Sequence, residues 1–169
     1  MIVVLLSGCS FKSEKRELSQ HNFKGLSFKV SDEWTYDEEW EDSEYNETGM
    51  MRFYNEEATK NVVSFDLKEI SASKNSKKSK KDLIVDKLSF DNYDGMGSAF
   101  GGKWEKSGDI EYYVENVKYS AYNNERKGKN ILVPTDDYKS CYVILTLCED
   151  KGLMNNLVED LSSSFGFEE

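Results

Sequence analysis

The segment from Tyr138 to Cys148 constrains the fold more than any other part of the chain, because it carries apolar side chains at both alternating positions. Neighbouring side chains of a β-strand point to opposite faces of its sheet. The two alternating sets are Cys141, Val143, Leu145 and Leu147, against Tyr142, Ile144 and Cys148. A strand of this kind is buried on both faces. The sequence therefore predicts a sheet that is covered on both sides at this strand.

Cys141 and Cys148 lie seven residues apart in this segment, so in one strand their side chains point to opposite faces. They cannot bridge each other there, because a disulfide needs Cα atoms within about 7 Å of one another. We expect both to be small buried apolar residues. The absence of a disulfide framework fits a Gram-positive surface protein better than an animal secreted protein.

Alternation of apolar and polar residues predicts further strands that bury one face. These strands are expected at 26–30, 50–55, 62–70, 98–105 and 109–122. The last two are separated by a turn at 106–109 and should form a hairpin. Within the second of them the apolar parity changes, which predicts a β-bulge near Glu115 and Asn116.

Two segments have the spacing of amphipathic helices. The first is 78–90, after a run of lysines, and the second follows Asp150, which is a suitable N-cap residue. Strands and helices alternate in blocks, with hairpin turns between the strands rather than repeated crossover units. This order predicts an α+β domain with a mostly antiparallel sheet flanked by helices.

The charge of the chain limits its partners. The 169 residues carry a formal net charge of −10, whereas a nucleic-acid surface needs clustered Lys and Arg. Nucleic acid is therefore excluded as the expected partner. A negative surface is also repelled by anionic headgroups, so contact with a membrane would need a separate anchor.

Such an anchor is predicted at Cys9. The residues Leu6-Ser7-Gly8-Cys9 resemble the end of a bacterial lipoprotein signal, in which the Cys receives a lipid thioether. We expect residues 1–8 to be the remnant of this signal, with the natural start codon upstream. The other interpretation is a short apolar strand with an incidental Cys. The apolar run is too short to span a bilayer, which needs about 20 residues.

The polar residues that follow the Cys, 9–22, are expected to form a flexible tether between the lipid and the folded domain. This arrangement predicts a location at the extracytoplasmic face of the bacterial cell membrane. The membrane would be contacted through the lipid on Cys9, and a protein or peptide at the cell surface is the expected partner.

The stretch GLSFKVSDEW, residues 25–34, resembles the opening strand of PsbP-like lipoprotein domains, which read Gly-x-x-Phe-x-x-Pro-x-x-Trp. Gly25, Phe28 and Trp34 match this pattern, and Ser31 replaces the usual Pro. The final Ser162-x-x-Phe165 is similar too. The resemblance implies one PsbP-like domain over 23–169, an α-β-α sandwich in a family of binding and assembly factors without shared catalytic residues.

The sequence offers little for catalysis or for a cofactor. Its single histidine, His21, falls in the expected tether, where it is expected to be solvated. Histidine-dependent triads, zinc sites and general-base schemes therefore have no candidate. We expect a protein that is not an enzyme and that binds no cofactor.

Residues 32–47 hold nine carboxylates and no Lys or Arg, which predicts a loop or a solvated edge. Aromatic residues are interleaved with the acids, so this segment could attract a cationic peptide, a basic partner or a divalent cation. The candidate binding residues are Trp34, Asp37, Glu38, Trp40, Glu41, Asp42 and Tyr45. The alternatives are a solvated loop that maintains solubility, a carboxylate-dependent hydrolase and a Ca²⁺-responsive surface protein. Trp34 is the aromatic residue most expected to be buried.

Overall fold

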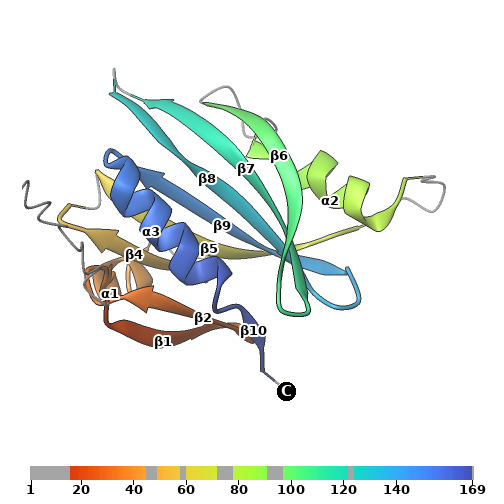
Figure 1. The fold of residues 1–169 in the computed structure, drawn as a ribbon, viewed down its shortest axis with the longest axis horizontal. Coiled ribbons are helices and arrows are strands. Elements are labelled where there is room, and N and C mark those ends of the chain that lie inside the picture. Colours follow the sequence, from red (N-terminus) through yellow and green to blue (C-terminus); the bar gives the residue numbers. More distant parts are fainter. Residues whose placement is uncertain are drawn as a thin grey trace, which may run out of the picture.

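A computed structural model describes residues 16–44, 49–57, 60–71, 78–90, 97–121 and 124–168 of the chain. It contains ten strands and three helices within these ranges (Figure 1). The elements are β1 Leu18–Phe23, β2 Leu26–Ser31, β3 Thr35–Tyr36, α1 Glu38–Glu41, β4 Met51–Asn55, β5 Asn61–Glu69, α2 Lys80–Leu88, β6 Gly97–Ser107, β7 Ile110–Ala121, β8 Asn124–Pro134, β9 Ser140–Cys148, α3 Lys151–Ser162 and β10 Gly166–Phe167.

The main sheet has seven strands in the order β3-β4-β5-β9-β8-β7-β6, and β9 is the central strand. A second sheet has the order β1-β2-β10. All the strand pairs are antiparallel. The prediction of an α+β fold with a mostly antiparallel sheet is therefore confirmed.

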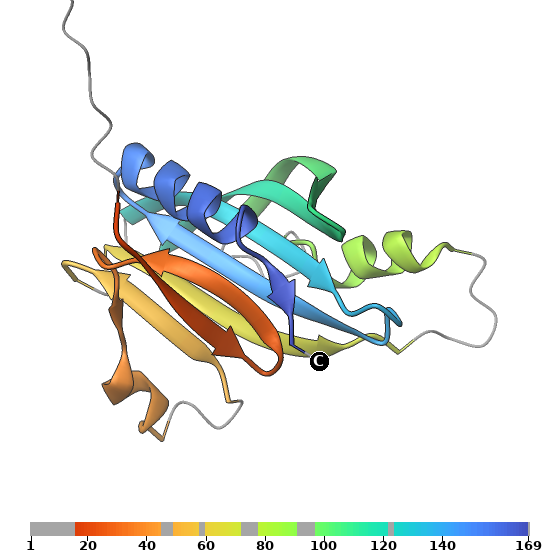
Figure 2. The ribbon, with the colours of Figure 1, turned by 60° about the horizontal axis from the view of Figure 1, so that its bottom comes forward.

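Helix α3 and the small sheet cover one face of the main sheet (Figures 1 and 2). The core on this side contains Phe28 of β2 and Phe65 of β5, whose rings stack with centroids 4.3 Å apart. Leu157 and Leu161 bring α3 onto the same core. Asp150 caps the helix, because its side chain accepts a hydrogen bond from the Leu153 amide at 2.6 Å.

Helix α2 packs on the opposite face of the main sheet. Its residues Ile84 and Leu88 are buried against Leu132, Cys141 and Val143. Since Tyr142 and Ile144 belong to the core under α3, β9 is buried on both faces as its sequence predicts. Cys141 and Cys148 are free and buried, also as expected.

Strand β7 is regular where a bulge was expected. Tyr112 and Val114 face the α3 side, whereas Glu115 and Val117 face the α2 side, so the covered face changes along a continuous strand. The register instead shifts in the partner strand β6, between Phe100 and Lys103. The irregularity lies opposite Glu115, at the predicted position, but the extra residue is in β6 rather than in β7. The change of parity in β7 itself comes from burial of opposite faces at the two ends of the strand.

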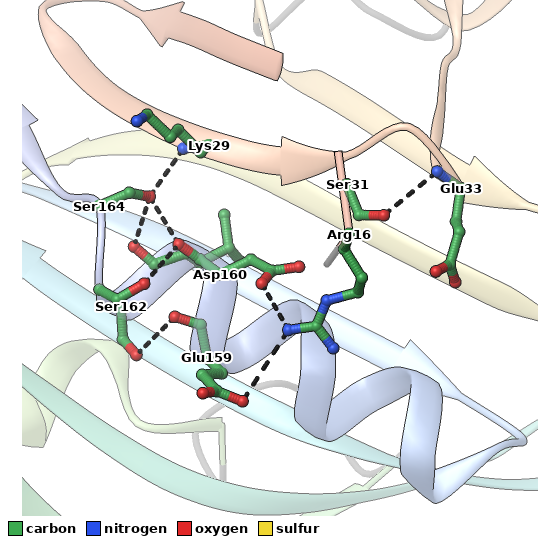
Figure 3. A network of polar contacts seen from close by, with 10 residues as sticks. Arg16, Lys29, Ser31, Glu33, Glu159, Asp160, Ser162 and Ser164 are labelled. Atoms are coloured by element: carbon green, nitrogen blue, oxygen red, sulfur yellow. Dashed lines mark hydrogen bonds and ion pairs between the residues drawn. The ribbon is translucent and has the colours of Figure 1, made fainter. Parts of the chain in front are cut away.

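The expected tether over 9–22 was too long at its C-terminal end, because Leu18–Phe23 is strand β1 and pairs with β2. The fold reaches back to Arg16, whose guanidinium contacts Asp160 of α3 (Figure 3). His21 is not solvated as expected: it lies on β1, half-buried, with its ring 4.8 Å from that of Phe53. Residues 9–15, including Cys9, lie outside the described residues.

Candidate binding site

The acidic segment, predicted as a loop or a solvated edge, forms β3, the edge strand of the main sheet, and the short helix α1. Asp37 is the N-cap of α1, and its Oδ1 accepts a hydrogen bond from the Trp40 amide at 3.0 Å. Unlike its acidic neighbours, Asp37 is buried, with 7% of its surface exposed. Its Oδ2 accepts a hydrogen bond from Arg52 Nε of β4 at 2.8 Å and forms an ion pair with Arg52 Nη2 at 2.7 Å. Asp37 therefore joins the helix to the sheet.

Arg52 also contacts the aromatic side chain of α1. Its guanidinium carbon lies 4.2 Å from the centre of the Trp40 ring, which is a cation–π geometry. The buried Nε1 of Trp40 has no hydrogen-bond partner within the part of the chain that the structure describes. Arg52 is thus occupied by one carboxylate and one indole, and it holds both in fixed positions.

Tyr36 of β3 lies beside the helix, with its ring 5.3 Å from that of Phe53. Its hydroxyl donates a hydrogen bond to Glu41. Burial, followed by the hydrogen bond to Glu41 and by the charges of the surrounding carboxylates, raises the pKa of Tyr36 above its usual range. The hydroxyl therefore stays neutral and remains a donor at physiological pH.

These side chains surround an open depression of about 640 Å³. It is lined by Thr35, Tyr36, Asp37, Glu38, Glu39, Trp40, Ser43, Arg52 and Tyr54. Glu38 and Glu39 line it and are exposed, and the remaining acids of α1 and of the residues after it are exposed too: Glu41, Asp42 and Glu44. Aromatic walls and a rim of negative charge can hold a cationic side chain, through cation–π contact and Coulomb attraction.

The structure brings together only part of the predicted binding set. Asp37, Glu38 and Trp40 line the depression. Glu41 does not line it, but it accepts a hydrogen bond from the hydroxyl of Tyr36, which does. Asp42 follows as the C-cap of α1. Trp34 lies elsewhere: it is buried in the main core with 6% of its surface exposed, as expected for that residue.

Tyr45 lies outside the described residues. Six lining residues are not in the predicted set: Thr35, Tyr36, Glu39 and Ser43 of the acidic segment itself, and Arg52 and Tyr54 of β4. Arg52 and Tyr54 occupy alternate positions of β4, which places them on one face of the sheet beside α1. The signal that could have identified them is this alternation, because Phe53 between them faces the core.

The alternative of a carboxylate-dependent hydrolase needs two carboxylates that face one another across a cleft with separated pKa values. The buried carboxylate of Asp37 instead forms an ion pair with Arg52 and accepts a hydrogen bond from the Trp40 amide. Across the described ranges, no group of three or more His, Cys, Asp or Glu residues could hold a metal ion. Nor is any helix in these ranges long and apolar enough to cross a membrane.

No family model matches the sequence, and no curated protein matches it. Solved structures do match the fold. The PsbP protein CyanoP of Synechocystis sp. PCC 6803 is 15% identical, with a TM-score of 0.59 over 96% of this chain and 99% of CyanoP. The Ran-binding protein Mog1p of Saccharomyces cerevisiae is 13% identical, with a TM-score of 0.59 over 90% of this chain and 96% of Mog1p.

LpqN of Mycobacterium tuberculosis, which is involved in cell envelope biogenesis, is 11% identical, with a TM-score of 0.59 over 92% of this chain and 91% of LpqN. At these identities the likeness concerns the fold. It agrees with the resemblance of residues 25–34 to the opening strand of PsbP-like domains and with the antiparallel sheet between helices. The chain therefore has the PsbP-like α+β fold, which CyanoP, Mog1p and LpqN share.

Proposed function

We propose that this chain is a binding domain that a lipid on Cys9 holds at the extracytoplasmic face of a bacterial membrane. Its ligand is a cationic segment of a protein partner, which binds in the depression beside α1. The observation that carries the proposal is that Trp40 and Tyr36 line the same depression as the exposed Glu38 and Glu39. Arg52, the only Lys or Arg among its described lining residues, is already paired with Asp37.

The chemistry of the depression supports a cationic ligand. A Lys or Arg side chain entering it gains Coulomb attraction from Glu38 and Glu39, which form no ion pair with another described residue. The aromatic rings add a face for the same cation. Because these carboxylates are exposed, the attraction is screened by salt, and binding should weaken as ionic strength rises.

The structural neighbours support a binding or accessory role. Mog1p is a Ran-binding protein, and LpqN is involved in cell envelope biogenesis. A shared fold does not transfer a ligand, so the partner has to be identified by the chemistry of this depression.

Binding is tested with a labelled peptide that contains alternating Lys and Tyr residues, against a peptide of the same length in which Glu replaces Lys. We expect saturable binding of the first peptide only, and a loss of about tenfold in affinity for the double variant Glu38→Gln, Glu39→Gln. The matched control is Glu69→Gln with Glu168→Gln, which removes two exposed carboxylates away from the depression. Equal losses in the two variants would show an effect of net charge and would contradict the proposed site.

The anchor is tested separately, in bacteria that express the gene from its authentic start and are fed an alkyne fatty acid. We expect the parent protein to be labelled and to fractionate with membranes. The variant Cys9→Ala should be unlabelled and released from the membrane fraction. A parent protein that stays unlabelled would rule out the anchor and leave the binding proposal standing.

A further inference from the structure

A groove lies on the α3 side of the main sheet, between the N-terminal end of α3 and strands β6, β7 and β8. It has a volume of about 500 Å³ and is more enclosed than the depression beside α1. Helix α3 packs on β8 and β9, and β6 and β7 continue past it, so the groove lies where the sheet extends beyond the helix (Figure 1). Its lining includes Phe100 of β6, Asn116 of β7, Lys127 of β8, Cys148 of β9, and Lys151 and Met154 of α3.

Apolar residues line the groove on two sides. Phe100 of β6 is 54% exposed, and Leu18 is the other exposed large apolar residue in the part of the chain that the structure describes. Met154 of α3 and Cys148 of β9 belong to the core under α3 and also line the groove. A ligand with an apolar body would remove the Phe100 ring from water and contact Met154, and both changes favour binding.

The charged residues of the lining favour an anion. Lys127 and Lys151 are exposed, and neither forms an ion pair with another described residue. Glu125 is paired with a lysine of β7 at 3.1 Å, which leaves Glu149 as the one lining carboxylate without an ion pair among the described residues. Asp150, next in the chain, is outside the lining, and its side chain caps α3. The unpaired charges of the lining are therefore two cations and one anion, in a chain whose net charge is −10.

A third ammonium group is held beside the lining. Lys129 Nζ donates to Asn116 Oδ1 at 2.6 Å, and Asn116 Nδ2 in turn donates to a carbonyl of β6 at 3.2 Å. Burial and then the charge of Lys103 lower the pKa of Lys129, and Lys151 adds to this effect while Glu105 opposes it. Positive charges of β6, β8 and α3 thus converge on one region, and an anion bound there would relieve their repulsion.

We propose that the groove binds a small amphipathic carboxylate, an apolar chain or ring that ends in one carboxylate group. The apolar part lies against Phe100 and Met154, and the ammonium groups of Lys127, Lys129 and Lys151 attract the carboxylate. The volume suits such a molecule, because pockets for small ligands measure roughly 300–1,000 Å³. The groove shares no lining residue with the depression beside α1, and its ligand has the opposite charge, so the two proposals are independent.

Octanoate and 1-octanol test the proposal, because they share a chain length and only octanoate carries a charge at pH 7. The ε-methyl group of Met154 reports binding in a ¹³C–¹H correlation spectrum of the full chain. We expect octanoate to shift this resonance saturably and 1-octanol to bind about threefold to tenfold more weakly, the range for the loss of two or three exposed ion pairs. No saturable shift with octanoate, or equal affinities for the two probes, would overturn the proposal. An acidic peptide with one Phe that shifts this resonance where octanoate does not would assign the groove to a protein partner instead.

The double variant Lys127→Gln, Lys151→Gln separates the charge from the apolar contact. It should lower the affinity for octanoate about fivefold and leave the affinity for 1-octanol unchanged. The matched control Lys29→Gln, Lys87→Gln removes two exposed lysines of β2 and α2 that do not line the groove, and it should change neither affinity. Equal losses of octanoate affinity in the two variants would show an effect of net charge and would contradict the assigned site.

Phe100→Ala tests the apolar contact. Phe100 is 54% exposed, so its replacement should keep the fold, and it should weaken the binding of octanoate and of 1-octanol alike by about threefold or more. The resonances of residues under α3 report whether each variant is folded. A folded Phe100→Ala variant that binds both probes as well as the parent would place the bound chain elsewhere and contradict the assignment.

Discussion

Arg16 donates a hydrogen bond from Nη2 to Asp160 Oδ1 at 2.7 Å and so joins the first described residue of the fold to helix α3 (Figure 3). The side chain of Asp160 is 6% exposed and that of Arg16 is 26% exposed. The same helix end is fixed to β2, because Ser164 Oγ accepts from the Lys29 amide at 2.8 Å and donates to the Asp160 carbonyl at 2.6 Å. Arg16 therefore compensates a buried charge in a region where two layers meet.

Replacement of Arg16 by Leu should destabilise the domain by about 2 kcal/mol at pH 7, because it leaves the buried Asp160 carboxylate without its cation. Glu159 lies 3.9 Å from Arg16 but is 75% exposed, so Glu159→Gln should change stability by less than about 0.5 kcal/mol. Urea unfolding measures both. A double variant Arg16→Leu, Asp160→Asn should recover most of the loss, and a failure to recover it would show that Arg16 acts through packing instead.

The same pair predicts a pH dependence. Burial raises the pKa of the Asp160 carboxyl, and Arg16 opposes that rise, so the Arg16→Leu variant should have a still higher pKa in the folded state. An acid with a higher pKa when folded binds more protons in the folded state, so its effect on stability becomes more favourable as the pH falls through that pKa. The difference in free energy of unfolding between the Arg16→Leu variant and the parent should therefore be largest near pH 7 and should shrink on acidification. A difference that grows on acidification would contradict this assignment.

Asp37 should contribute more to stability than any of the exposed acids of α1. Asp37→Ala removes the N-cap of α1 and the partner of Arg52, and we expect a loss of about 2 kcal/mol in urea unfolding. Glu38→Ala is the matched control on the next residue. Glu38 is exposed, so its removal should cost no more than about 0.5 kcal/mol. Equal effects of the two variants would mean that the Asp37–Arg52 contact is weak in solution.

The parts of the fold that could be predicted are those in which burial produces a periodic pattern of apolar residues in the sequence. Strand β9 has apolar residues on both sides because it is the central strand, and α3 shows helical spacing because one side of it faces the core. Strand β1 was missed for the opposite reason. It lies at the edge of the small sheet, only Phe23 of its six residues is buried, and its pairing with β2 is made by the backbone.

The candidate site shows the same division. Asp37 and Trp40 could be found in the sequence because acids and aromatics gather within one segment, but Arg52 lies 15 residues from Asp37, on another element. The environment of the buried Asn130 is harder still to predict, because its hydrogen-bond partners Leu88 and Glu115 come from α2 and β7. No local pattern in the sequence reports where these two partners lie.

Glu115 should be the most sensitive buried polar position on the α2 side of the sheet. Glu115→Leu leaves the donors of Ser89, Phe90 and Asn130 without their acceptor, and we expect a loss of about 3 kcal/mol. Hydrogen exchange of the Phe90 amide should accelerate more than that of amides under α3. Ser89→Ala removes one donor and leaves two, so it should cost about 1 kcal/mol. Unchanged exchange at Phe90 in Glu115→Leu would show that the carboxylate does not hold this segment.

The two cysteines of β9 should be unreactive in the folded protein. Burial raises the pKa of the Cys148 thiol to about 12 and raises that of Cys141 above its usual range, so the reactive thiolate is scarce at pH 8. In a Cys9→Ser variant, a disulfide reagent should therefore modify neither thiol until the protein unfolds, and the rate should follow the unfolded fraction across a urea titration. Cys141 is 0% exposed and Cys148 is 3% exposed, so any reaction in the folded state should begin at Cys148. Rapid modification of both thiols without urea would mean that the central strand opens far more often than its burial on both faces allows.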